Sequence, residues 1–164
     1  MMLMRHPLTA RRAFALYGML TGALPPAAIF YKSFSWSNVT SENELLLICA
    51  LMNVACAAIG YWFGGALGQS LTDLKRKGWH RALLGALWLG ALWGWCTGSL
   101  SGLVFFGIGA IFGAFYGLLG GALAFALFTP LHRLLSRGDM IDARHFWPVA
   151  CGITAALAAL IVNL

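Results

Sequence analysis

Apolar residues in this sequence form long uninterrupted runs, and polar residues gather in short segments between them. Residues 82–128 contain no charged residue at all. At about 1.5 Å per residue, one helix of that length would measure roughly 70 Å, more than twice the hydrocarbon core of about 30 Å. The run therefore predicts two membrane crossings. We place the turn between them at Gly98-Ser99-Leu100-Ser101-Gly102, because Gly and Ser interrupt helices.

The same length criterion predicts five membrane-spanning helices in a single domain, residues 1–164. The expected spans are approximately 13–31, 45–69, 82–97, 103–128 and 147–163. Composition agrees, since 60% of the residues are hydrophobic and 10% are charged, whereas soluble domains have about 25% charged residues. The fold class is therefore an all-α integral membrane bundle. The last span is short, so it either crosses the bilayer or lies at the interface.

The basic residues test both the number of spans and their orientation. With five spans, ten of the eleven Lys and Arg residues fall on one side, and Lys32 lies on the other. Basic residues in short loops are retained in the cytoplasm. We therefore expect a cytoplasmic N-terminus, a C-terminus on the opposite side and a bacterial inner membrane. Six of these residues are expected to bind anionic lipid headgroups or an acidic partner subunit. They are Lys75, Arg76, Lys77, Arg81, Arg133 and Arg137.

Glycine recurs every four residues in three of the predicted spans. The residues are Gly60, Gly64 and Gly68, then Gly90, Gly94 and Gly98, then Gly109, Gly113, Gly117 and Gly121. Residues four apart share one helix face, and a glycine face lets another backbone approach closely. This spacing predicts Gly-x-x-x-Gly helix packing. The alternatives are that glycine is simply frequent in membrane helices or that the glycines line a narrow pore.

Residues 58–71 can also be aligned with residues 114–127, which matches Gly64-Gly65 with Gly120-Gly121. Such a match is expected from a duplicated helical hairpin, as in many transporters. Sequence rich in Gly, Ala and Leu also matches itself by chance.

Few polar or helix-breaking residues lie within the spans. Asn53 and Thr21 lie at mid-span, and Pro25-Pro26 interrupt the first span. These four are candidate pore or substrate contacts. The commoner use of such polar residues is a hydrogen bond between helices, and a proline pair is expected to kink the helix. No ionisable side chain other than Cys or Tyr is expected at mid-membrane depth, which argues against proton-coupled carriers and ion pumps.

The remaining reactive residue types give weaker signals. The four cysteines form no Cys-x-x-Cys pair, so we expect small apolar side chains inside the bundle and no metal or cofactor. Trp88 and Trp93 lie deeper than the other tryptophans and face either lipid or a cofactor of a partner, of which we expect lipid. His80, His132 and His145, with Asp73, Asp139 and Asp142, lie at the cytoplasmic boundary. They lack a recognisable metal-ligand spacing.

Three functions are compatible with these patterns. The first is a structural or accessory subunit within a larger membrane complex, which the glycine faces favour. The second is a small transporter or channel for a neutral solute, lipid or ion. The third is a membrane enzyme, for which the histidines and aspartates would converge at the cytoplasmic surface. The expected partners are membrane lipids and other membrane subunits or a second copy, and not nucleic acid.

Overall fold

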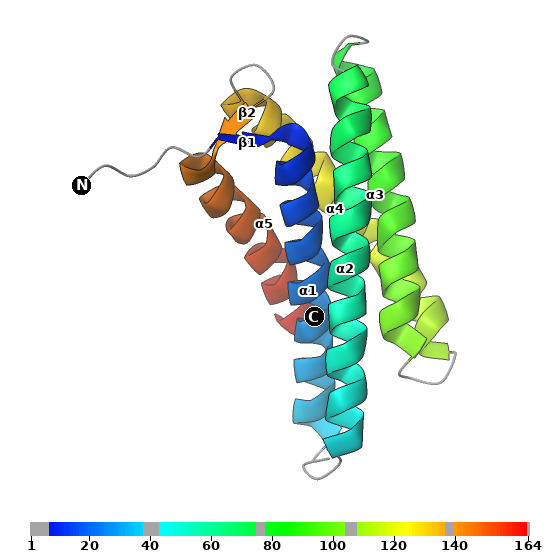
Figure 1. Cartoon of the computed structure of the whole chain (residues 1–164). Helices are drawn as coiled ribbons and strands as arrows, with labels where there is room; N and C mark the ends of the chain where they lie inside the picture. Colours follow the sequence, from blue (N-terminus) through cyan, green and yellow to red (C-terminus); the bar gives the residue numbers. More distant parts are fainter. Residues whose placement is uncertain (1–6, 38–42, 75–77, 104–107, 137–139, 164) are drawn as a thin grey trace, which may run out of the picture.

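The computed structural model describes residues 7–37, 43–74, 78–103, 108–136 and 140–163, and most of them are helical (Figure 1). The helices are α1 Ala10–Ser37, α2 Asn43–Leu74, α3 Trp79–Gly102, α4 Ile108–Leu135 and α5 Ala143–Asn163. All five are long and apolar enough to cross a membrane. The prediction of five helices apolar enough to cross a membrane is confirmed within the described residues, which are mostly helical.

The predicted turn between the third and fourth spans was wrong. Residues 98–102 belong to α3, and α4 begins only at Ile108. Gly98 and Gly102 lie against the backbone of α4. The small side chains in this segment therefore allow two helices to approach, rather than ending one of them.

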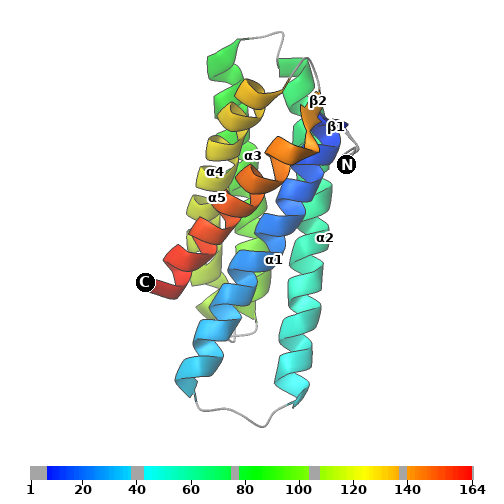
Figure 2. The ribbon, with the colours of Figure 1, turned by 90° about the vertical axis from the view of Figure 1, so that its left-hand side faces the viewer.

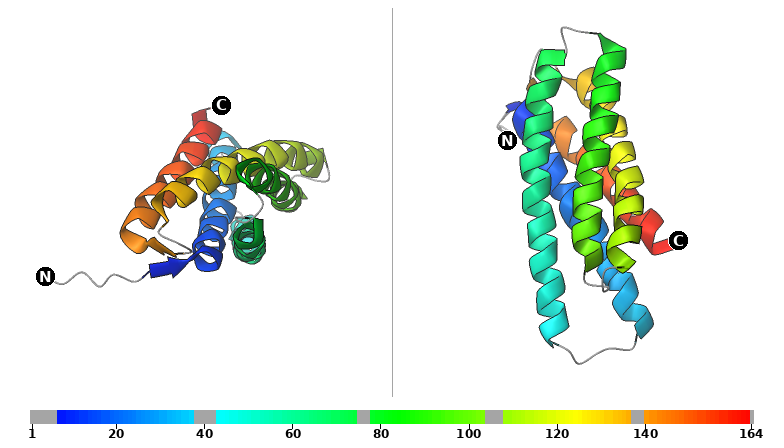
Figure 3. Two further views of the ribbon diagram at one scale, coloured as in Figure 1. Left: turned by 90° about the horizontal axis from the view of Figure 1, so that it is seen from above. Right: turned by 90° about the vertical axis from the view of Figure 1, so that its right-hand side faces the viewer.

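The bundle consists of two antiparallel pairs and a fifth, diagonal helix. The most extensive contacts join α3 to α4 and α1 to α2. Figures 2 and 3 show α5 crossing α1 and α4 obliquely on the side away from α2. Helix α1 is the central element, because 56% of its span is buried whereas the corresponding share is 17–28% for the other four.

A short antiparallel ribbon, which the sequence did not predict, joins the starts of α1 and α5. Strand β1, Pro7–Thr9, pairs with β2, Met140–Asp142 (Figure 1). Ile141 of β2 is 1% exposed, so the ribbon contributes to the core. The last residue of each strand also caps the helix that follows. Thr9 Oγ1 accepts from the Arg12 amide at 3.4 Å, and Asp142 Oδ1 accepts from the Arg144 amide at 3.2 Å.

Helix α5 runs diagonally beside α1 and ends well before the far ends of α1 and α2 (Figures 1 and 2). The Lys32 side chain of α1 donates a hydrogen bond to the Ile161 carbonyl of α5 at 3.4 Å. A cation at this position stabilises the negative end of the α5 dipole. Because α5 begins at Ala143 and has 21 residues, it is longer than the span predicted from Trp147, and its last turn reaches the level of Lys32.

Aromatic side chains from three helices form the core near the end where α1 begins. Tyr17 of α1 stacks on Phe128 of α4, with ring centroids 4.0 Å apart and planes 8° apart. Phe14 meets the edge of Phe128 at 5.0 Å, and Phe146 of α5 meets it at 6.0 Å. These rings join α1, α4 and α5 through side chains rather than through close backbone contact.

Candidate functional site

The backbones of α3 and α4 approach each other closely, and glycines face glycines along this interface. The pairs are Gly90 with Gly121, Gly94 with Gly117, Gly98 with Gly113 and Gly102 with Gly109. A Cβ added to Gly94 would overlap the Gly117 carbonyl oxygen, and one added to Gly117 would overlap the Gly94 carbonyl oxygen. No larger residue fits at these positions unless the helices separate.

The α1–α2 pair has a similar interface with fewer glycines. Gly18 and Gly60 face each other reciprocally, and Gly64 lies against the Phe14 carbonyl. Gly68 lies against Arg11, with an added Cβ 2.8 Å from the Arg11 Cα. Sequence reasoning missed the glycines of α1, although Gly18 and Gly22 have the same four-residue spacing. It also missed Gly102, which it assigned to a turn.

The proposed duplication aligns residues with different surroundings. Gly64 lies in an interface, whereas a Cβ on Gly120 would meet nothing within 4 Å. The α4 glycine with surroundings like those of Gly64 is Gly121, which faces the Gly90 carbonyl. The sequence alignment of residues 58–71 with residues 114–127 therefore differs by one residue from the correspondence that the helix interfaces give.

Buried hydroxyl groups satisfy their hydrogen-bonding potential within their own helices. Thr21, which is 2% exposed, donates to the carbonyl oxygens of Tyr17 and Gly18 at 2.9 and 3.2 Å. Thr97 donates in the same way to Trp93 and Gly94. The expectation that Thr21 bridges two helices was wrong. Because the Thr21 hydroxyl donates to carbonyls of its own helix, it is not available to donate to a neighbouring helix.

Tyr17 forms a short hydrogen bond between two helices. Its hydroxyl donates to the Ala124 carbonyl of α4 at 2.8 Å, and the tyrosine is fully buried. A weaker link joins α2 to α3, where Cys56 Sγ donates to the Thr97 carbonyl at 3.6 Å. Tyr17 was not predicted to make this contact, because the sequence pattern of a span does not show whether an aromatic residue faces lipid or another helix.

Asn53 lies in α2 at the level of the proline pair of α1. This follows from the antiparallel register, in which Gly22 of α1 lies against the Cys56 carbonyl of α2. Asn53 is half-buried, and its side chain makes no hydrogen bond within the described part of the chain. Helix α1 continues through Pro25 and Pro26 to Ser37.

Trp93 does not face lipid, which corrects the expectation from its depth. It is 4% exposed, and its ring meets the edge of Phe125 of α4 at 5.4 Å. Its indole Nε1 has no hydrogen-bond partner among the described residues. Trp88, in contrast, is 68% exposed. The two tryptophans lie five residues apart, so they project from different faces of α3.

The cysteines also divide between the interior and the surface. Cys49 and Cys56 of α2 are buried, as expected, but Cys96 and Cys151 are exposed. The expectation that all four lie inside the bundle was therefore wrong for two of them.

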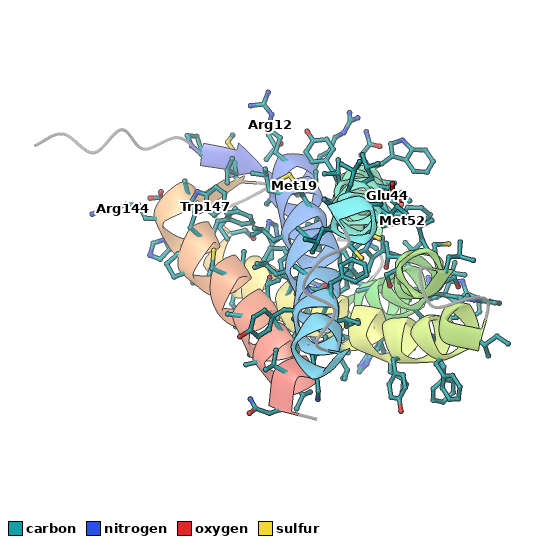
Figure 4. All side chains as sticks on the ribbon, turned by 90° about the horizontal axis from the view of Figure 1, so that it is seen from below. Arg12, Met19, Glu44, Met52, Arg144 and Trp147 are labelled. Carbon is teal, nitrogen blue, oxygen red and sulfur yellow. The ribbon has the colours of Figure 1, made fainter. Side chains whose placement is uncertain are left out.

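Basic side chains gather at the end of the bundle where α1, α3 and α5 begin, which we call the basic end. Arg12, Arg81 and Arg144 are exposed there, and Figure 4 shows Arg12 and Arg144 pointing away from the helices. Arg133 is half-buried, with its guanidinium carbon 4.8 Å from the centre of the Trp79 ring. The other predicted members, Lys75, Arg76, Lys77 and Arg137, lie outside the described residues.

The described histidines at this end do not belong to any group of side chains that could hold a metal ion. His132 is 7% exposed, and its ring centroid lies 5.0 Å from that of Phe14, whereas His80 and His145 are exposed. Within the described residues no three His, Cys, Asp or Glu side chains are placed to hold a metal ion. The Asp73 side chain and all of Asp139 are outside them.

One apolar groove lies on the outer side of α3 and α4. It has a volume of about 460 Å³ and is lined by Trp95, Ser99, Ala110, Ile111, Ala114, Phe115 and Leu118. Among the described residues that line it, none is charged and Ser99 is the one with a side-chain hydroxyl. The groove therefore offers mainly apolar contact.

Comparison with protein-family models, with curated proteins and with solved structures found no match to this chain. The function is therefore argued from the geometry of the bundle itself.

Proposed function

We propose that this chain is an integral membrane protein that serves as a structural or accessory subunit of a larger membrane complex. The observation that carries the proposal is the pair of backbone-to-backbone interfaces, α1 with α2 and α3 with α4. In lipid, helices associate through such packing because burial from water no longer drives them together. Two tightly packed hairpins are suited to present fixed outer faces to a partner.

The buried polar groups support a packing role over a transport pathway. A path for a solute needs polar groups directed into a common space. Here the hydroxyls of Thr21, Thr97, Thr129 and Thr154 all donate to carbonyl oxygens of their own helices. Bonds of this kind leave the helix interfaces apolar.

The part of α4 nearest its start is the best candidate contact surface for a partner. No residue in the segment 109–120 is fully buried, although this segment packs along α3. Its large outward side chains are Ile111, Phe112, Phe115, Tyr116 and Leu119, all at least 47% exposed. A membrane helix of another subunit would pack on these side chains in place of lipid.

The charge distribution supports an orientation. The basic end carries Arg11, Arg12, Arg81 and Arg144 as exposed side chains, and Lys32 and Glu44 lie toward the other end. We propose that the basic end faces the cytoplasm of a bacterium, which gives a cytoplasmic N-terminus and a C-terminus on the opposite side.

Gentle purification of the tagged full chain from its native membrane, followed by mass spectrometry, tests the accessory role. The proposal expects partner proteins in fixed stoichiometry. A Phe115→Ala/Leu119→Ala variant should lose them, and a Trp62→Ala variant, altered on exposed α2, should keep them. A homo-oligomer or monomer that carries only lipid would contradict the proposal.

A transport role is the second candidate, and the position of Asn53 favours it. Pro25 and Pro26 lack N–H groups, so the carbonyls of Thr21 and Gly22 lose their usual helical donors. The Asn53 amide, which has no hydrogen-bond partner among the described residues, lies at this level of the bundle. Under this alternative Asn53→Leu should slow glycerol-driven swelling of liposomes that contain the protein, and Asn163→Leu, at the end of α5, should not.

A further inference from the structure

We propose that the basic end holds a binding site for a phosphate group, built from Arg133 of α4 and the first turn of α3. Its ligand is the phosphate of an anionic lipid headgroup. The inference depends on the membrane placement proposed above but not on the accessory role, so each can fail without the other.

The Arg133–Trp79 pair carries the argument. The guanidinium carbon lies 4.8 Å from the centre of the Trp79 ring, within the range of a cation–π contact. Trp79 is 41% exposed and is the first residue of α3. This contact holds the guanidinium beside the start of α3. Tryptophan is also the residue most typical of the headgroup level of a membrane.

At least one hydrogen-bond donor of Arg133 has no partner among the described residues. Nη1 is buried and has no acceptor within the described part of the chain. A guanidinium has five N–H donors and is charged at any physiological pH. A bound anion would supply the acceptor that the buried Nη1 lacks among the described residues, and phosphate matches the planar geometry of the guanidinium.

The start of α3 differs from the two other helix starts at the same end. Thr9 caps α1 and Asp142 caps α5, whereas α3 begins after Gly78 with no side-chain cap. No acidic residue lies in its first turn, which contains His80 and Arg81 instead. An anion bound beside Arg133 would satisfy the free amides of that turn and offset its concentration of positive charge.

The ligand has two possible sources with the same chemistry, a lipid headgroup and soluble phosphate. The depth of the pair favours lipid, because Trp79 and Arg133 are both inside the segments that are apolar enough to span a membrane. A phosphate at the end of a lipid reaches this depth without leaving the interface. A soluble ion would have to give up its hydration shell.

Lipid titration of the purified full chain, read by native mass spectrometry in a neutral detergent, tests the proposal. The probes are dioleoylphosphatidylglycerol, dioleoylphosphatidylcholine and inorganic phosphate. The variant is Arg133→Gln, and the matched control is Arg144→Gln, which removes the same charge from the capped start of α5. Arg133→Lys keeps the positive charge but removes the planar set of N–H donors. This variant replaces Arg133→Gln in the test if the glutamine variant does not fold.

The wild type is expected to bind phosphatidylglycerol more tightly than phosphatidylcholine. Removal of one charge near an anionic surface weakens binding about fivefold, and Arg144→Gln should lose no more than this. Arg133→Gln should lose about tenfold or more, because hydrogen bonds to a charged group are also lost, and Arg133→Lys should fall between the wild type and Arg133→Gln.

Competition by millimolar inorganic phosphate would identify a phosphate site open to soluble ions, and no competition would identify lipid as the source. Equal losses in Arg133→Gln and Arg144→Gln, or wild-type binding by Arg133→Lys, would overturn the proposal in favour of diffuse attraction.

Discussion

The indole nitrogen of Trp93 in α3 lies 3.3 Å from the position that a Cβ on Gly60 of α2 would occupy. The same Cβ would overlap the Gly18 carbonyl of α1. Gly60 is therefore a point at which three helices meet, and it joins the α1–α2 pair to the α3–α4 pair. Trp93 continues the connection to α4 through its edge-to-face contact with Phe125.

Substitution of Gly60 by alanine is expected to destabilise the bundle by about 1–3 kcal/mol, the usual cost of overpacking a close contact. The matched control is Gly65→Ala on the same helix, where the new Cβ would lie 3.7 Å from the Ala15 Cβ, an ordinary contact. Gly65→Ala should be neutral or stabilise by up to about 1 kcal/mol. The free energy of unfolding in bicelles measures both. Equal effects of the two variants would show that Gly60 is not at a three-helix junction.

The Tyr17 hydroxyl is expected to contribute a modest amount to stability. Tyr17→Phe keeps the ring stacked on Phe128 and removes only the 2.8 Å hydrogen bond to the Ala124 carbonyl. Hydrogen bonds between membrane helices average about 0.6 kcal/mol and reach about 1.7 kcal/mol, so a loss within this range is predicted. Tyr31→Phe is the control, because Tyr31 is 69% exposed. If Tyr17→Phe unfolds like the wild type, the α1–α4 link is not a polar one.

The reactivity of the natural cysteines distinguishes the interior of the bundle from its surface, so no substitution is needed. In mild detergent an apolar maleimide should modify the exposed Cys96 and Cys151 and leave the buried Cys49 and Cys56 unmodified. Intact mass should therefore show two adducts on the folded protein and four after denaturation. Modification of Cys56 as fast as Cys96 would contradict the contact between α2 and α3, because Cys56 is fully buried there.

The number of helices could be predicted from the sequence, because the length of an apolar run and the side on which basic residues fall are both local properties. The exact ends could not. Residues 98–102 have the composition of a turn. They continue a helix because Gly98 and Gly102 pack against Gly113 and Gly109 of α4. A glycine that ends a helix and one that admits a neighbour have the same local sequence.

The candidate contacts were predicted less completely than the spans. The glycines chosen for their spacing lie at the close approaches, and whether they drive packing stays a prediction. Trp93 was misplaced because all faces of an apolar helix look alike in sequence, and only the position of Phe125 and Gly60 decides which tryptophan is buried. The β1–β2 ribbon was missed because it pairs residues 7–9 with residues 140–142, and such pairing at long range leaves no periodic signal in segments of three residues.

The most direct test of the account compares two glycines of α4 that are three residues apart. Gly117 faces the Gly94 carbonyl, whereas a Cβ on Gly120 would meet nothing within 4 Å. Both changes to alanine raise helix propensity by the same amount, about 1 kcal/mol, so any difference between them reports the interface. In bilayer unfolding measurements, Gly117→Ala should destabilise the protein by about 1–3 kcal/mol, and Gly120→Ala should be neutral or stabilising. If Gly117→Ala proves as stable as Gly120→Ala, backbone contact between α3 and α4 does not hold this bundle together.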